Sequence, residues 1–197
     1  MGEDRAQRTE PYRPEMTQLI SEVVRLDQDI YAAIADSSTP ALDEPLRQLS
    51  NAANYSKVWI GIAAAMAVVG GQKGRRAAIT GLIAIAVTSA VVNQGIKRIY
   101  VRERPDREGE EVPEARHVRM PESTSFPSGH SASGFAFASA VGTQLPAAGA
   151  SLRFLAGAVA YSRVHTGVHY PGDAIIGSLV GAGLGSIVAA AARYWIS

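Results

Sequence analysis

The sequence contains no cysteine, which excludes disulfide bonds and any site that depends on a thiolate. An excess of charge of one sign is also missing, since 19 Lys and Arg side chains face 18 Asp and Glu, for a formal net charge of +1. A nucleic-acid-binding domain is expected to carry a basic surface, so we expect no nucleic-acid partner. Residues 1–15 lack the apolar stretch of a secretory signal, and we expect them to form a flexible tail.

The charged residues are unevenly distributed, and the mean hydropathy of only +0.03 hides this. Between Met16 and Ala35 apolar residues recur at helical spacing, with charged residues at many of the other positions. This pattern predicts an amphipathic helix, which the segment 37–40 ends, and a second, shorter one follows from Asp43 to Ala53. We interpret residues 16–56 as amphipathic interfacial helices, which could lie on a membrane, pair with another subunit in a homo-oligomer or pack on the core.

The rest of the chain contains long stretches without any charged side chain. They are Val58–Gln72, Ala77–Ile96, Ser131–Leu152 and Ala174–Ala192. Three of them have about twenty residues, the length with which an α-helix crosses about 30 Å of hydrocarbon. Tyr55 and Trp59 could anchor the shorter first stretch at the interface, and a weaker apolar helix covers 154–162.

No stretch shows the alternation of a β-strand, so we predict an all-α protein. The predicted fold is an integral membrane helical bundle with about five core helices in residues 57–197, preceded by the N-terminal amphipathic helices. A soluble bundle with alanine-rich buried helices is the alternative.

Polar and charged residues gather in three islands between the apolar stretches. The first island is 97–105, the second is 127–130, which opens a helix, and the third is 162–173. If neighbouring helices are antiparallel, with a turn at 144–149, all three islands lie at the same face of the bundle. We therefore expect them to form one pocket at the membrane boundary.

The residues of this pocket suit a phosphate group. Lys97, Arg104 and Arg163 would bring three cations together, and unpaired cations near a membrane need an anion. Ser128 and Gly129 stand at a helix start, where free backbone N–H groups and the helix dipole favour a phosphate. The sequence thus predicts a phosphate-binding site.

Two histidines and an aspartate could supply the chemistry. Asp173 follows His169 by four residues and can reach one of its ring nitrogens across a turn, leaving the other as a nucleophile. His130 could act as general acid for the leaving oxygen. No dense carboxylate cluster accompanies the histidines, so we expect no metal ion and no other cofactor. Each residue alone could be a helix cap, an interfacial anchor or a structural histidine; only their combination indicates a site.

The three islands match a known pattern in their order and spacing. They read Lys97, six residues, Arg104-Pro105; then Pro127-Ser128-Gly129-His130; then Ser162-Arg163, five residues, His169, three residues, Asp173. This resembles the three-part signature of the type 2 phosphatidic acid phosphatases, a superfamily shared with vanadium haloperoxidases and bacterial acid phosphatases. Every signature position is filled. Integral members commonly have six spans, whereas we find four and a weak fifth.

The resemblance implies a helical core and metal-independent hydrolysis of a lipid phosphate monoester or diphosphate. By this resemblance His169 is the nucleophile that forms a phosphohistidine, Asp173 orients it, and His130 protonates the leaving group. The implied phosphate-binding residues are Lys97, Arg104, Ser128, Gly129 and Arg163. His117 and His165 match no signature position.

A pocket at the membrane boundary favours a lipid whose tail stays in the bilayer. Candidates are phosphatidate, phosphatidylglycerol phosphate, and polyprenyl phosphates or diphosphates, including cell-wall carrier lipids. The resemblance favours an active site on the extracytoplasmic face of the cell membrane, although the Lys and Arg residues at the two ends do not decide the orientation. Two other functions stay open: a vanadate-dependent haloperoxidase, and a non-enzymatic binder of lipid head groups.

Overall fold

The computed structural model describes residues 14–195. Two helices, α1 (Pro14–Asp36) and α2 (Pro40–Ala52), precede the core. The core helices are α3 (Lys57–Val69), α4 (Gly71–Ala90), α6 (Gly129–Gly142), α7 (Pro146–His165) and α8 (Pro171–Trp195). The described residues include no β-strand, and the predicted all-α class is confirmed. Most of the predicted tail lies outside the described residues, and its last two residues, 14 and 15, already belong to α1.

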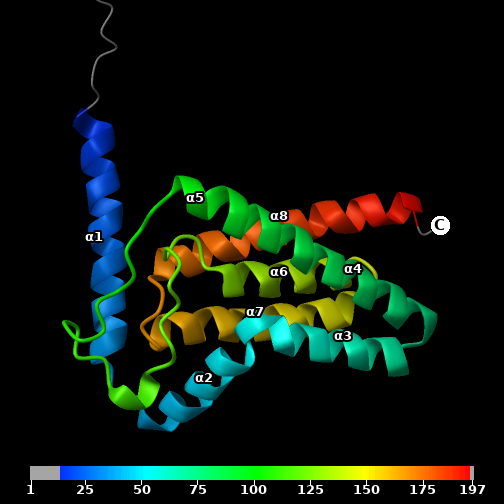
Figure 1. The fold of residues 1–197 in the computed structure, drawn as a ribbon, viewed down its shortest axis with the longest axis horizontal. Coiled ribbons are helices and arrows are strands. Elements are labelled where there is room, and N and C mark those ends of the chain that lie inside the picture. The colour runs from blue at the N-terminus through cyan, green and yellow to red at the C-terminus, as the bar shows by residue number, and fades with distance from the viewer. Residues whose placement is uncertain (1–13, 196–197) are drawn as a thin grey trace, which may run out of the picture.

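Two helical turns and one long loop connect these helices at the end of the bundle that carries α1. The turn η1 (Asn54–Ser56) joins α2 to α3, and α4 continues through a π-helical turn, η2 (Val91–Ile96), into α5 (Lys97–Ile99). A long loop with one helical turn, η3 (Glu114–Arg116), then leads to α6. Figure 1 shows the five core helices running along the long axis of the molecule, with α1 crossing them at one end.

The core forms around α6, which packs against α4, α7 and α8. Most of the side chains of α6 are buried, and they are mainly Ala, Ser and Gly. Small side chains allow helix backbones to approach closely, which favours packing where no hydrophobic driving force acts between helices. The composition of α6 therefore explains its central place in the bundle.

Three glycines at intervals of four residues let α8 lie directly on α6. A Cβ atom at Gly177, Gly181 or Gly185 would overlap a backbone carbonyl oxygen of the facing segment. Those oxygens belong to Ser128, Ala132 and Ala136. Gly183, on another side of α8, has no heavy atom within 4 Å of its would-be Cβ. The contact between α6 and α8 thus needs glycine at 177, 181 and 185 but not at 183.

We expect Gly181→Ala to destabilise the protein by about 1–3 kcal/mol, because the added methyl group forces the two backbones apart. The matched variant Gly183→Ala should instead be neutral or stabilising by up to about 1 kcal/mol, since alanine is the better helix former. Thermal unfolding of both variants in one detergent would compare them. Equal unfolding temperatures would contradict this account of the α6–α8 contact.

The number of helices that could cross a membrane differs from the number of apolar stretches. By length and composition, the segments Gly71–Ile99 and Pro171–Tyr194 qualify, and the bent pair Pro40–Ala52 and Asn54–Val69, with 67° between its parts, could form a third span. The apolar stretch 131–152 is not one span, because α6 ends at Gly142 and α7 begins at Pro146. Proline suits the first position of a helix but cannot continue a preceding one.

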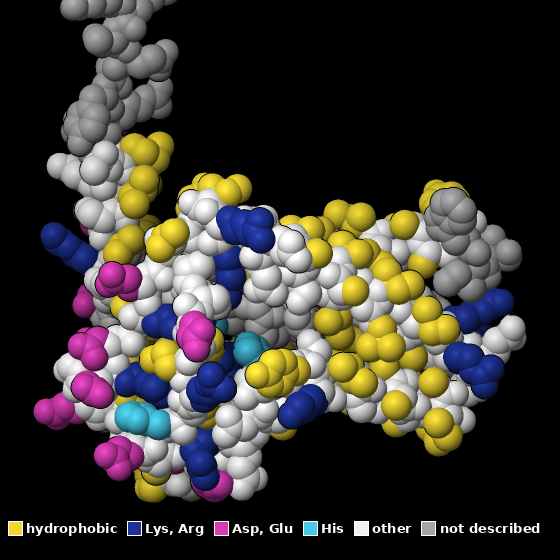
Figure 2. Space-filling model, viewed as in Figure 1, with side chains coloured by type: hydrophobic (Ala, Val, Ile, Leu, Met, Phe, Trp, Pro, Cys, Tyr) yellow, Lys and Arg dark blue, Asp and Glu magenta, His cyan; other side chains and the backbone are white. Residues whose placement is uncertain are grey.

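The surface of the bundle is apolar along its middle and charged at its ends. Figure 2 shows hydrophobic side chains covering the flank of the core helices, with Lys and Arg side chains at both ends and acidic side chains gathered at the end that carries α1. Large side chains such as Ile83, Val87 and Leu179 are among the exposed ones. An apolar belt of this kind matches a lipid bilayer and supports the predicted membrane bundle.

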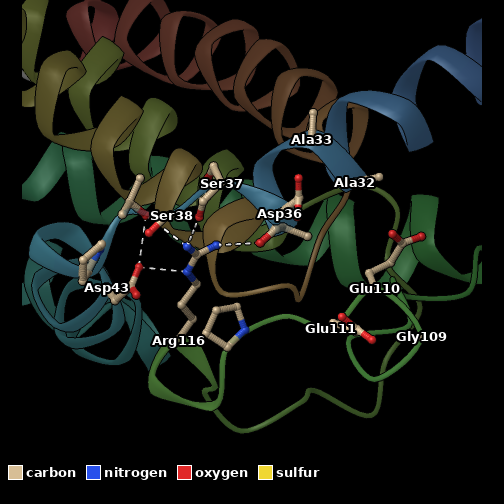
Figure 3. A pocket seen from close by; sticks show the side chains of 14 residues that line it. Ala32, Ala33, Asp36, Ser37, Ser38, Asp43, Gly109, Glu110, Glu111 and Arg116 are labelled. Atoms are coloured by element: carbon tan, nitrogen blue, oxygen red, sulfur yellow. Dashed lines mark hydrogen bonds and ion pairs between the residues drawn. The ribbon is translucent and has the colours of Figure 1, made fainter.

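A buried arginine, Arg116, connects the end of α1 to α2 through hydrogen bonds (Figure 3). Arg116 is only 1% exposed; it donates to two carbonyl oxygens of the last turn of α1 at 3.1 Å and to the carboxylate of Asp43 at 2.8 Å. Asp43 also pairs with Nε2 of His165 at 3.0 Å. These contacts give Arg116 a structural role, because a buried guanidinium requires its partners. The adjoining cavity of about 690 Å³ is lined by none of the predicted site residues.

Candidate active site

The three islands meet at the end of the bundle that carries α1. A cavity of about 270 Å³ opens there, with residues of η1, the start of α3, the end of α4 and the start of α6 in its wall. The predicted site residues in this wall are Lys97, Arg104, Gly129, His130 and His169. The other three, Ser128, Arg163 and Asp173, lie behind the wall and are at most 1% exposed. The structure therefore brings all eight residues to one place.

His169 lies in the short loop between α7 and α8, and Asp173 is in the first turn of α8. Nδ1 of His169 is 3.5 Å from a carboxylate oxygen of Asp173 and 3.3 Å from Oγ of Ser125. The same carboxylate oxygen accepts hydrogen bonds from the Ser125 hydroxyl and, at 2.9 Å, from the backbone N–H of Tyr170. A carboxylate on this side of the ring favours the proton on Nδ1, which leaves Nε2 with its lone pair.

The imidazole of His169 is neutral at physiological pH. Burial, together with the charges of Arg104 and Arg163, lowers the pKa of His169 to about 4, against the opposing effect of Asp173. Nε2 lies 3.4 Å from a guanidinium nitrogen of Arg104 and therefore faces the cations of the site. A neutral, oriented imidazole beside cations is suited to attack an anionic electrophile.

Three cations line or support the cavity, and none of them forms an ion pair with an acidic side chain among residues 14–195. Lys97 donates to Oγ of Ser123 at 3.1 Å, and Arg104 donates to the carbonyl oxygen of Ser123 at 2.9 Å. Arg163 donates to Oγ of Ser50 at 2.6 Å, and its Nε has no hydrogen-bond partner among the described residues. Although burial lowers the pKa of Arg104 to about 10, its guanidinium stays charged at neutral pH. Buried or half-buried cations that lack a carboxylate favour the binding of an anion.

The start of α6 adds backbone donors to the same site. Ser128 caps this helix, and its Oγ accepts from the hydroxyl of Ser131 at 3.0 Å. A Cβ atom at Gly129 would have only Oδ1 of Asn93 within 4 Å, at 3.7 Å, so the backbone is open to the cavity. Free N–H groups at such a helix start can bind phosphate oxygens directly.

His130 is held by a residue outside the three islands. Its Nε2 lies 3.0 Å from Oδ1 of Asn54 in η1. The next two residues, Tyr55 and Ser56, have φ of 56° and 58°, which non-glycine residues adopt at a cost in free energy. The turn η1 therefore positions Asn54 so that its side chain contacts His130, the predicted general acid.

No metal site competes with this interpretation among residues 14–195. No three His, Cys, Asp or Glu side chains there are arranged to hold a metal ion. The donor set consists of cations, two histidines and backbone N–H groups, which suits an anion rather than a divalent cation.

The sequence model of the PAP2 superfamily matches residues 78–197, which contain all three islands. The chain belongs to the PAP2 superfamily. A decaprenylphosphoryl-5-phosphoribose phosphatase of Mycobacterium tuberculosis is 31% identical over 163 residues, which cover 81% of this chain and 84% of that protein. The phosphatase of the same name from Mycolicibacterium smegmatis is 35% identical over 152 residues, or 75% of this chain and 77% of that protein.

Two solved PAP2-like structures share the fold. LpxE of Aquifex aeolicus has a TM-score of 0.61 at 23% identity, with 83% of this chain and 94% of that chain covered. A transmembrane PAP2 type phosphatidylglycerolphosphate phosphatase of Bacillus subtilis has a TM-score of 0.63 at 22% identity, with 89% and 86% covered. At these identities the likeness shows the fold alone.

Membership of the PAP2 superfamily, together with phosphatases as relatives, makes this chain a phosphoric ester hydrolase of the lipid phosphatase family. The alternative of a non-enzymatic head-group binder is therefore wrong. The long apolar helices make it a membrane protein.

Proposed function

We propose that this PAP2 protein hydrolyses a phosphate monoester on a polyprenyl-linked lipid, and that it does so through a phosphohistidine at His169. The observation that carries this proposal is the neutral, buried imidazole of His169 beside Arg104, in a site whose three cations form no ion pair with an acidic side chain among the described residues. The lipid class follows from relatives at 31% and 35% identity, both named decaprenylphosphoryl-5-phosphoribose phosphatase. A lipid-linked pentose phosphate is thus the substrate class that we expect.

In the first step Nε2 of His169 forms a bond to phosphorus while the bond to the leaving-group oxygen breaks. The ring then carries a positive charge, which Asp173 stabilises through Nδ1–H. His130 gives its proton to the leaving oxygen. Burial, followed by the charge of Arg163, lowers the pKa of His130, so the imidazole alone does not hold this proton at neutral pH. A substrate phosphate monoanion can bring the proton in, and its negative charge offsets the cations.

In the second step water attacks phosphorus and the bond between phosphorus and nitrogen breaks. His130, now neutral, takes a proton from this water, and inorganic phosphate leaves. In both steps Lys97, Arg104 and Arg163, with the N–H groups at the start of α6, would stabilise the charge on the equatorial oxygens. The protein needs no metal ion for either step in this scheme.

We place the cavity on the extracytoplasmic side of the membrane. The opposite end of the bundle carries Lys73, Arg75, Arg76, Arg153 and Arg193 and no acidic residue in its loops. Figure 2 agrees, since that end shows Lys and Arg but no acidic side chains. Cytoplasmic loops are rich in Lys and Arg, and that end fits this rule. The cavity end also carries basic residues that bind no phosphate in this scheme, such as Lys57, Arg98 and Arg119, so the family resemblance carries the orientation.

The test is phosphate release by the purified protein in detergent and excess EDTA. The substrates are a polyprenylphosphoryl pentose phosphate, phosphatidate, phosphatidylglycerol phosphate, and undecaprenyl phosphate and diphosphate. We expect the pentose phosphate to be hydrolysed fastest and EDTA to have no effect. Halide oxidation with vanadate and peroxide, without turnover of any phosphate ester, would favour the haloperoxidase alternative instead.

A further inference from the structure

Helix α1 carries a row of large apolar side chains that are more than half exposed. Leu19, Val23 and Leu26 are 56–59% exposed, although the helix is amphipathic. Only the C-terminal half of α1 is anchored, where Tyr31 and Ala35 are 2% and 5% exposed. The N-terminal half extends past the edge of the bundle (Figure 1). Such a row of exposed apolar residues indicates a surface that another apolar phase covers.

The apolar side of α1 is turned toward the flank of the core helices rather than away from it. Leu19, Val23 and Ile30 share a side of α1 with Asp27 and Tyr31, because they follow one another at intervals of three and four residues. Asp27 and Tyr31 contact the end of the bundle. Figure 2 shows hydrophobic side chains on the side of α1 that is turned toward the apolar flank of the core.

This side of α1 continues into the apolar flank of α8. Ile34, near the end of α1, lines an apolar groove of about 410 Å³ between α7 and α8. In the same groove Ile175 and Leu179 are 58% and 64% exposed, on a helix long and apolar enough to cross a membrane. A helix that crosses the end of such a span, with its apolar side toward the flank, has the geometry of an interfacial helix.

We propose that α1 lies in the membrane interface, with its apolar side in the acyl-chain boundary of the leaflet that the active-site cavity faces. The polar side of α1 carries Glu22 and Asp29 but, of the basic residues, only Arg25. Attraction to anionic lipids therefore contributes little, and the burial of apolar surface holds the helix in place. We expect the docking to occur on purely zwitterionic lipid.

The absence of cysteine makes a direct test possible, since one introduced cysteine gives one label. Nitroxides are placed at Leu19→Cys and Val23→Cys, with Gln18→Cys and Arg25→Cys as controls on the polar side, in nanodiscs of zwitterionic lipid. The first two labels should be accessible to oxygen and shielded from a water-soluble nickel chelate. The two controls should show the reverse.

Two outcomes would overturn the proposal. Equal access of the nickel chelate to all four labels would mean that α1 stands in water. Dipolar broadening at Val23→Cys between two copies in one nanodisc would mean that a second copy of the chain covers the apolar side. Neither readout depends on enzymatic activity.

A different observation concerns Arg102, which lies in the first island but outside the signature positions. Its guanidinium donates to the outer carboxylate oxygen of Asp173 at 2.8 Å and to Asp27 of α1 at 2.7 Å. It also stacks on the ring of Tyr170, 4.1 Å from its centroid. Asp27 in turn accepts the N–H of Gly172 at 2.6 Å, at the start of α8. Asp173 is thus held on the side opposite to His169.

We infer that Arg102 and Asp27 are positioning residues for the pair of Asp173 and His169, an inference that rests on the proposed role of His169. One oxygen of Asp173 is occupied by Arg102, which leaves the other for Ser125, Tyr170 and His169. Loss of the guanidinium would free the carboxylate to rotate. We expect an effect on activity of about 10–100-fold, the size seen for the outer partners of metal-ligating histidines.

We expect Arg102→Met to lower kcat by about 10–100-fold with KM changed less than about twofold. Arg102→Lys should recover part of kcat, because it restores the charge but not both hydrogen bonds. Asp27→Asn should lower kcat in the same direction, and its effect should not add to that of Arg102→Met. The exposed Arg98→Met, from the same island, is the matched control.

A lower unfolding temperature with unchanged kcat in Arg102→Met would overturn the inference and leave a structural role only. Fully additive effects of Arg102→Met and Asp27→Asn would also contradict it. Failure of the proposed function would be recognised by a different result, namely turnover that survives in His169→Asn.

Discussion

Replacing His169 by asparagine is expected to lower phosphate release by a factor on the order of 10⁴ or more, the size of effect seen when a nucleophile is removed. The reason is geometric, because Nε2 of His169 faces the cations of the cavity while Nδ1 is directed to Asp173 and Ser125. Asparagine fills part of the space but offers no nucleophilic nitrogen. The measurement is kcat for the best substrate in detergent, with phosphate release as the readout.

The control for this variant is another histidine of the same chain. His117 contacts the carbonyl oxygen of Val112 at 2.9 Å and does not line the active-site cavity. His117→Asn should keep kcat within about twofold of the wild type. Rapid quenching in base with radiolabelled substrate should trap an acid-labile phosphoprotein in the wild type and none in His169→Asn. Turnover of His169→Asn within tenfold of the wild type would refute the nucleophile assignment.

The second large effect is expected at Asp173, where asparagine should lower kcat by about 10³–10⁴-fold. The carboxylate accepts hydrogen bonds from Arg102, Ser125 and the N–H of Tyr170, and it lies beside Nδ1 of His169. An amide offers only one acceptor oxygen, so its N–H₂ group must face one of these donors. The proton of His169 is then no longer held on Nδ1, and no carboxylate stabilises the positive charge of the ring.

Binding of phosphate should survive this substitution, because Lys97, Arg104 and Arg163 remain in place. The inhibition constant for inorganic phosphate is the readout for binding, measured beside kcat. Asp29→Asn, on the exposed polar side of α1, serves as the control for the same chemical change. Near-normal turnover in Asp173→Asn would show that Asp173 does not orient His169.

Local signals in the sequence account for the helices and for part of the site. The turn of α8 brings Asp173 to His169, because residues four apart meet across one helical turn. Proline and the polar segment 37–40 end α1 where the pattern predicts. The absence of charge in 131–152 alone suggested one span, since charge does not distinguish one long helix from two packed ones. The turn expected at 144–149 agrees with the break between Gly142 and Pro146.

The sequence by itself determined that this is an all-α membrane protein with a three-part phosphatase signature, because hydrophobic periodicity and motif spacing are local properties. Only the tertiary structure decided which residues support the signature. Asn54 reaches His130, Ser50 reaches Arg163, and Asp27 reaches Arg102 across 76, 113 and 75 residues of sequence. Each of the three comes from the amphipathic region, whose pattern gives no sign of the site. Contacts of this separation arise from the packing of α1 and α2 on the bundle, and spacing along a single chain carries no information about them.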